Sequence, residues 1–128
     1  MPRRYSRSGW NDEALTDAAT DARNLLNNST GGDTGITTGR VFYLRGLSIS
    51  NEHATNQGVL ELWDVAAEGV PGATTQRGNW IIPANYSVLL DFPSPGIQFK
   101  NGILGTISAG TVAIASVLVW GYEEEAES

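Results

Sequence analysis

The chain has 128 residues, of which 41% are hydrophobic and 17% charged, and this length fits one domain with a core of its own. The absence of cysteine excludes disulfides and thiolate metal sites, and a formal net charge of −6 argues against a nucleic-acid partner, whose phosphates it would repel. The longest apolar run, Val112 to Trp120, is too short to cross a bilayer as a helix, so no membrane partner is expected.

The first segment, residues 1–39, differs in composition from the rest and is interpreted as an N-terminal arm. Its start is basic, with Arg3, Arg4 and Arg7, and no apolar stretch follows that would make it a signal peptide. Apolar residues between positions 11 and 28 recur every three or four residues, which predicts a partly helical segment with a narrow apolar stripe. Such a helix is marginal in isolation and needs a partner surface.

The arm ends in a glycine-rich linker at residues 27–35, which lacks the Gly-Lys-Ser/Thr ending of a phosphate loop. Because this composition decouples the arm from the following domain, we predict that the arm docks on another protein chain. Trp10 fits equally an interface anchor and a local hydrophobic staple. The candidate interface residues are Arg3, Arg4, Arg7, Trp10, Leu15, Leu25 and Leu26.

The second segment, residues 40–122, alternates apolar and polar residues in short runs separated by turn residues. This pattern predicts a mainly β domain, an antiparallel β-sandwich or jelly roll of about seven to eight strands. Asn101-Gly102 favours a type I′ turn, so the strands on either side of it are expected to form a hairpin. The expected strands are residues 40–50, 59–64, 80–82, 86–92, a strand that begins with Ile97 and Phe99, 103–107 and 111–122.

The period-two pattern also predicts which side chains form the core of this domain. The tryptophans of the domain are Trp63, Trp80 and Trp120, which are read as core residues in preference to a stacking platform for a sugar. The remaining predicted core residues are Leu60, Leu62, Val88, Leu90, Ile97, Phe99, Ile114 and Leu118. The last segment, residues 123–128, holds four glutamates and is interpreted as a solvated acidic tail.

No motif for catalysis, cofactor or metal binding stands out. The single histidine, His53, lies in a polar turn without an identifiable nucleophile or orienting carboxylate. Glu61, Asp64, Glu68 and Asp91 are candidates for an acid/base pair, but a β-sandwich carries such acids on its outer faces anyway. The sequence therefore predicts a protein that is not an enzyme and that has no cofactor.

The strand and turn order of residues 40–123 resembles small structural proteins of tailed bacteriophages. The runs that carry the resemblance are residues 41–50, 58–64, 82–88, 91–92, 96–104 and 110–123. In particular, this order is similar to that of capsid decoration (cement) proteins and related virion β-sandwich proteins. Residues 1–39 have no counterpart in it.

The resemblance implies a non-enzymatic virion protein that binds the outer surface of a phage head and stabilises it through multivalent contacts. Its implied partners are the major capsid protein or another virion protein, and further copies of itself, with a homotrimer favoured. Two other interpretations stay open: another phage component, such as a head fibre, tail or adaptor protein, and a carbohydrate-binding jelly-roll module.

Overall fold

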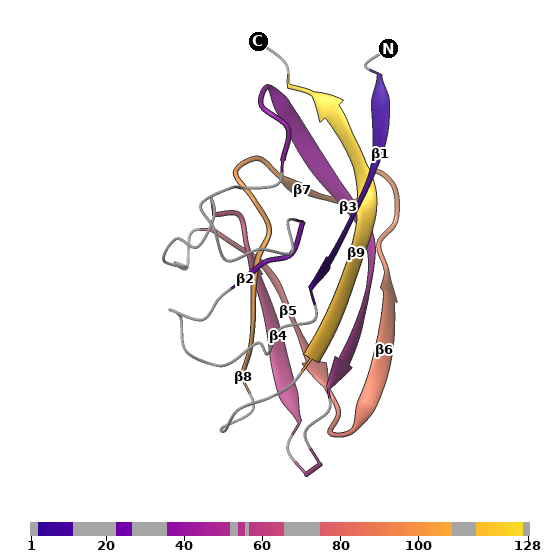
Figure 1. Cartoon of the computed structure of the whole chain (residues 1–128), viewed down its shortest axis with the longest axis vertical. Helices are drawn as coiled ribbons and strands as arrows, with labels where there is room; N and C mark the ends of the chain where they lie inside the picture. Colours follow the sequence, from indigo (N-terminus) through magenta and orange to yellow (C-terminus); the bar gives the residue numbers. More distant parts are fainter. Residues whose placement is uncertain are drawn as a thin grey trace.

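The computed structural model describes residues 3–11, 23–26, 36–51, 54–55, 57–65, 75–108 and 115–126. Within these ranges every regular element is a strand, and the strands form two antiparallel sheets (Figure 1). The expectation of a mainly β, antiparallel protein is confirmed. None of the described elements is a helix long and apolar enough to cross a membrane.

Sheet A has the strand order β1-β9-β3-β6, and β7 also pairs with β3. Sheet B has the order β2-β8-β4-β5. The strands of sheet A are β1 (Arg4–Asn11), β3 (Arg40–Asn51), β6 (Tyr86–Asp91), β7 (Ile97–Phe99) and β9 (Ala115–Glu125). Those of sheet B are β2 (Arg23–Asn24), β4 (Gly58–Trp63), β5 (Gln76–Ile82) and β8 (Leu104–Ser108).

One hydrophobic core joins the two sheets, because buried residues of both belong to a single cluster. Of the predicted core residues, Leu60, Leu62 and Phe99 are fully buried. Val88, Leu90 and Ile97 are partly buried and pack against the same cluster. The polar Asn51 at the end of β3 also links the sheets, since its side-chain amide donates to the carbonyl of Ile82 at 3.2 Å.

The prediction that Leu118 lies in the core is wrong, and Ile114 lies outside the described residues. Leu118 is 42% exposed, whereas its neighbours Val117 and Val119 are fully buried. Alternate residues of a strand face opposite sides of the sheet, and here both sides carry apolar residues. The period-two signal is therefore ambiguous along this strand. It does not decide between Leu118 and its neighbours Val117 and Val119 as the residues that face the core.

The hairpin predicted at Asn101-Gly102 is also wrong. The strand before this dipeptide, β7, pairs with β3 in sheet A, whereas the strand after it, β8, pairs with β4 in sheet B. The loop crosses between the sheets and is held by the buried Asp64. Oδ1 of Asp64 accepts the backbone N–H groups of Lys100, Asn101 and Gly102 at 3.0, 2.7 and 3.4 Å.

The N-terminal segment is part of the fold, so the predicted boundary between residues 39 and 40 does not separate an arm from a domain. Residues 4–11 form an edge strand of sheet A on β9, and Leu25 and Leu26 belong to the core cluster. The partly helical segment is not found where the structure describes it, because Asn11 ends a strand and residues 23–26 form a strand and a turn. A strand in this place gives the backbone of β9 a second partner, which a helix cannot do.

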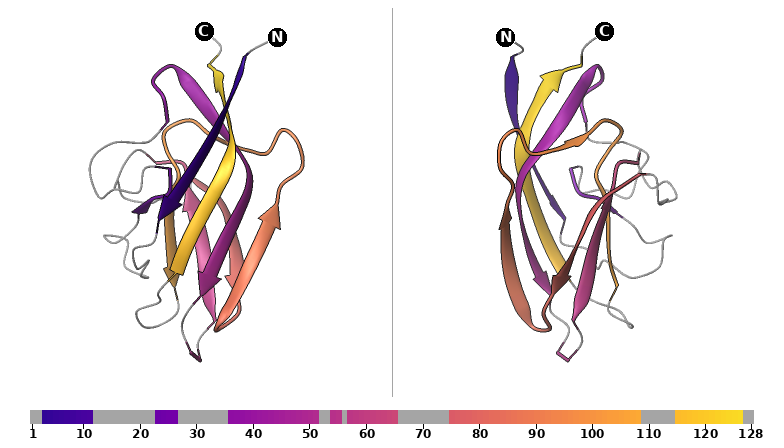
Figure 2. Two further views of the ribbon diagram at one scale, coloured as in Figure 1. Left: turned by 45° about the vertical axis from the view of Figure 1, so that its right-hand side comes forward. Right: turned by 180° about the vertical axis from the view of Figure 1, so that it is seen from behind.

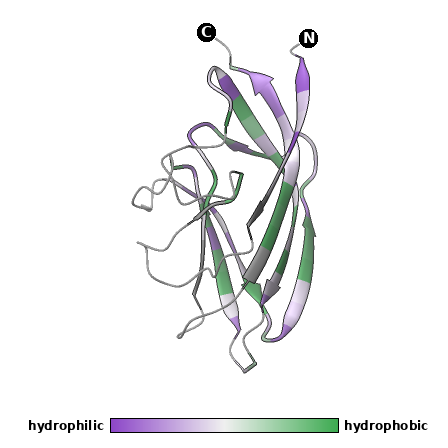
Figure 3. Ribbon diagram, in the orientation of Figure 1, coloured by the Kyte–Doolittle hydropathy of each residue, from purple (hydrophilic) through white to green (hydrophobic). Residues whose placement is uncertain are grey.

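The prediction of a solvated acidic tail from residue 123 onward is wrong for Glu123 and Glu124, while Glu125 is exposed and Glu127 lies outside the described residues. Strand β9 continues to Glu125, and Glu123 is 2% exposed. Since β1 and β9 are antiparallel, the start of β1 and the end of β9 lie together, where sheet A extends past sheet B (Figure 2). Figure 3 shows this end as the most hydrophilic part of sheet A.

Candidate functional site

The outer surface of sheet A, on the side away from the core, carries exposed apolar side chains. The register places Leu118 of β9 opposite Ser48 of β3, and Ser48 opposite Leu89 of β6. Directly paired residues share one face of a sheet, so both leucines lie on this surface. Leu89 is 64% exposed and Leu118 is 42% exposed.

Trp120 extends this apolar surface along β9. It lies two residues beyond Leu118 and pairs with Gly46 of β3, so it is on the same face. A Cβ atom at Gly46 would collide with the Trp120 indole, which shows that the ring lies across the glycine. Gly46 therefore gives the large indole room to lie against the sheet.

Small polar residues surround these apolar side chains. Ser50 and Ser87 exchange a hydroxyl hydrogen bond of 2.8 Å across β3 and β6. We call this surface the outer face of sheet A and define it by six uncharged residues: Ser48, Ser50, Ser87, Leu89, Leu118 and Trp120. The exposed Asp91, which pairs with Gly46 at the end of β6, borders them on the same side of the sheet. An uncharged patch with one aromatic and two aliphatic side chains has the chemistry of a protein-docking surface.

Two other exposed hydrophobic side chains lie elsewhere. Ile81, 63% exposed, pairs with Val59 on the side of sheet B away from the core. Tyr86, 60% exposed, begins β6 opposite Asn51. In the part of the chain that the structure describes, only the outer face of sheet A places two such exposed residues opposite the same residue, on the two strands that flank β3.

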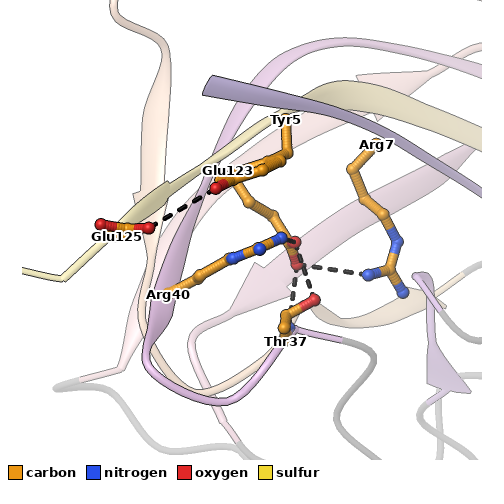
Figure 4. Close-up of polar contacts among 6 residues, drawn as sticks. All are labelled: Tyr5, Arg7, Thr37, Arg40, Glu123 and Glu125. Atoms are coloured by element: carbon orange, nitrogen blue, oxygen red, sulfur yellow. Dashed lines mark hydrogen bonds and ion pairs between the residues drawn. The ribbon is translucent and has the colours of Figure 1, made fainter. Parts of the chain in front are cut away.

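A buried carboxylate holds the two ends of the chain together (Figure 4). Oε2 of Glu123 accepts the backbone N–H of Thr37 at 2.9 Å and lies 3.2 Å from Nη1 of Arg7. Its Oε1 accepts the Thr37 hydroxyl at 2.8 Å and lies 3.3 Å from Nη1 of Arg40. We call Arg7, Thr37, Arg40 and Glu123 the terminal lock, because it joins β1, β3 and β9.

The lock shifts the titration of its carboxylate. Burial by itself raises the pKa of Glu123, because it disfavours the charged form. The two hydrogen bonds from Thr37, the positive charge of Arg7 and the hydrogen bond from Arg40 act in the opposite direction and outweigh it. The net result is a pKa for Glu123 below the ordinary glutamate value.

The candidate interface residues predicted from the sequence lie in different parts of the structure. Arg4 and Arg7 face the chain's own acidic strand, with Arg4 Nε 2.9 Å from Glu124 Oε1. Leu25 and Leu26 are core residues, so the prediction that they dock on another chain is wrong. Arg3 is exposed, while Leu15 and the side chain of Trp10 lie outside the described part.

The tryptophan prediction is correct for two residues and not for the third. Trp63 is 8% exposed, and Trp80 packs against the core and against Phe92, with ring centroids 5.5 Å apart. Trp120 lies on the outer face instead. The sequence signal that separates it is Gly46, which leaves space for a ring, but only the register of β3 and β9 reveals that they pair.

Among the acid/base candidates that the structure describes, Glu61 lies on β4 of sheet B and Asp91 ends β6 of sheet A. Asp64 holds the crossover loop and lies 3.4 Å from Nη2 of Arg77, a structural role. His53 and Glu68 lie outside the described residues. Among the residues that are described, no group of three or more His, Cys, Asp or Glu side chains is placed to hold a metal ion. The sequence matches no protein-family model, and no curated protein or solved structure is significantly similar to it.

Proposed function

We propose that this chain is a structural protein of a tailed-phage virion, a capsid decoration protein that binds the outer surface of the head. The observation that carries the proposal is the uncharged outer face of sheet A, where Leu89, Leu118 and Trp120 are aligned across β6 and β9. The strand order and turns of residues 40–123, which resemble those of decoration proteins, support it.

In this proposal the two sheets form a β-sandwich of the jelly-roll type, a rigid block that sits on the shell. Sheet A faces the capsid subunits, with Trp120 and the two leucines as anchors and the serines as small polar contacts. Apart from Asp91 at its border, the contact surface carries no charge, which suits an acidic protein, because most of the net charge of −6 then stays out of the interface. The acidic remainder keeps the decorated particles apart in solution.

The many identical sites of a shell supply the affinity. Each single contact is modest, but copies linked as a trimer bind the lattice together, and linkage multiplies the effective affinity. The homotrimer is therefore part of the proposal, and native mass spectrometry of the purified chain tests it.

The docking surface is tested by mixing the purified chain with empty heads of its phage and sedimenting the particles. Leu89→Asp or Leu118→Asp places a charge in the contact and is expected to remove the chain from the pellet. Ile81→Asp is the matched control, because Ile81 is 63% exposed, almost the same as Leu89 at 64%, but lies on sheet B. Binding that survives both sheet A changes, or that only Ile81→Asp removes, would contradict the proposal.

A further inference from the structure

A second feature of sheet A lies beyond the outer face, at the end where the chain termini meet. Here a partly enclosed hollow of about 470 Å³ is lined by Val41, Tyr43, Gln98, Lys100, Glu124, Glu125 and Ala126. Its size lies within the range of small-molecule sites, about 300–1,000 Å³. It forms where β7 ends opposite Phe42 and the chain leaves sheet A, while β3 and β9 continue.

The floor of the hollow contains a held aromatic ring. Tyr43 pairs with Tyr122 of β9, and the two rings stack with centroids 5.2 Å apart and an interplanar angle of 22°. On the far side, the Arg4 guanidinium lies 4.6 Å from the centre of the Tyr122 ring. The Tyr122 hydroxyl also donates to the carbonyl of Pro95 at 3.0 Å, and this hydrogen bond holds the Tyr122 ring in place. Tyr43 is therefore pre-positioned, as a binding residue needs to be.

The two walls carry polar groups of mixed character. On the β7 side, Gln98 donates to the Tyr43 hydroxyl at 3.3 Å and keeps its amide oxygen as an acceptor, and the exposed Lys100 follows two residues later. On the β9 side, Arg4 donates a hydrogen bond to Oε1 of Glu124. The second oxygen of this carboxylate can accept a hydrogen bond from a ligand hydroxyl. The walls thus offer both donors and acceptors, with charges of opposite sign on opposite sides.

We propose that this hollow binds a neutral saccharide, a single sugar ring or the terminal ring of a glycan. A pyranose has an apolar C–H face, which fits against Tyr43 and Val41, and a rim of hydroxyls that both donate and accept. Glu124 and Gln98 accept from the hydroxyls, and Lys100 donates to them. An anionic ligand such as phosphate is disfavoured, because Glu124 and Glu125 border the hollow.

This inference does not depend on the proposed attachment to a capsid. The hollow and the outer face of sheet A share no residue, so a change in one leaves the chemistry of the other intact. A chain that binds heads but no sugar therefore contradicts only the saccharide proposal. A chain that binds a sugar but no heads contradicts only the proposed attachment to a capsid.

The test is a titration of the isotope-labelled full chain with glucose, galactose, mannose and N-acetylglucosamine at millimolar concentrations, followed by backbone amide shifts in NMR spectra. At least one sugar is expected to give saturable shifts at residues 41–43, 98–100 and 124–126. Gln98→Ala should weaken that binding roughly three- to tenfold, the worth of about one net hydrogen bond. Gln57→Ala, the same change at an exposed site outside the hollow, should leave it unchanged.

Three results would overturn the inference. The first is the absence of saturable shifts with all four sugars. The second is binding that Gln98→Ala leaves unaltered while the amide spectrum remains that of the folded chain. The third is saturable shifts at these residues with inorganic phosphate and none with the sugars, which would make Lys100 part of an anion site instead.

Discussion

At the scale of single residues, Glu123 is the side chain that ties the ends of the molecule to its sheet. Its two carboxylate oxygens receive four contacts from three residues, Arg7, Thr37 and Arg40, and it is 2% exposed. Arg40 has a second role, since its guanidinium lies 3.5 Å from the centre of the Tyr5 ring. A buried carboxylate with this many donors stabilises the folded state, whereas the removal of its charge leaves Arg7 and Arg40 without their carboxylate counter-charge.

We predict that Glu123→Gln lowers the free energy of unfolding by about 1.5–3 kcal/mol, the range for hydrogen bonds to a charged group. Urea denaturation followed by tryptophan fluorescence measures it. Glu124→Gln is the matched control, because its partner Arg4 is 56% exposed, and such surface pairs contribute about 0–1 kcal/mol. Equal losses in the two variants would show that the lock is no stronger than a surface ion pair.

The lock also predicts a dependence of stability on pH. Because the pKa of Glu123 is lowered on folding, the unfolded chain takes up its proton first, and the folded state loses this stabilisation as the pH falls. The stabilisation is complete above the ordinary glutamate pKa of about 4.3 and disappears as the pH drops through the lower folded value. The measurement is the unfolding free energy from pH 7 downward in wild type and in Glu123→Gln, with the difference between them shrinking in acid. A difference that stays constant or widens at low pH would contradict this account.

At the scale of elements, the register of β9 on β3 decides which of its side chains face the core and which face outward. Its register on β3 runs from Arg40↔Glu125 to Asn51↔Ala115 with one irregularity between Leu44 and Gly46. Residues 117 and 119 point into the core as a result, and residues 118 and 120 point outward.

A pair of adjacent substitutions tests this register. Val119→Ala removes a fully buried side chain and is expected to lower the unfolding free energy by about 1.5–3 kcal/mol. Leu118→Ala, on the outer face, is expected to change it by less than about 0.5 kcal/mol. Thermal and urea unfolding of the two variants give the comparison. A larger loss for Leu118→Ala than for Val119→Ala would mean that the strand faces the other way.

The sequence predicts the positions of single strands better than the pairing between them. The alternation from Arg40 onward predicts β3 almost to the residue, and the start of β7 at Ile97 is also predicted correctly. The pairing of β7 does not follow from the sequence, since Asn-Gly favours a hairpin locally and only the buried Asp64, distant in sequence, holds this loop as a crossover. The outer face of sheet A does not follow from the sequence either, because a register is a relation between distant segments.

The prediction of two solvated ends is wrong for a related reason, since β1 and β9 pair although they lie at opposite ends of the sequence. Basic residues at the start and acidic residues at the end were interpreted as two solvated tails, although their opposite charges are complementary. Complementary charge at two termini is the signal that could have paired β1 with β9. The core leucines Leu25 and Leu26 were assigned to a helix because alanine-rich spacing resembles a helical stripe, but tertiary packing overrides that preference.

At the scale of the whole molecule, the N-terminal strand is a structural part of the fold. It covers the edge of β9 and supplies Arg4 and Arg7, and the close approach of Gly9 to Leu25 and Leu26 joins it to the core segment. Deletion of residues 1–11 is therefore expected to lower the midpoint of urea unfolding well below that of the full chain. The comparison is made at equal protein concentration, with Arg3→Ala as the control that leaves the strand in place. A truncated chain of unchanged midpoint would show that the segment is a separable arm.

The terminal lock lies at one end of sheet A, the proposed saccharide hollow is beside it, and the outer face lies further along the same sheet. If the chain binds a phage head through the outer face, as proposed, sheet A faces the shell and sheet B faces solvent.

Electron cryo-microscopy of heads carrying the bound chain measures that orientation directly. The account predicts ordered density for the chain on the outer surface of the shell, with Leu89, Leu118 and Trp120 against capsid subunits and Ile81 directed away from them. Density that places sheet B on the shell and the outer face of sheet A in solvent, or heads that carry no density for the chain after mixing, would contradict it.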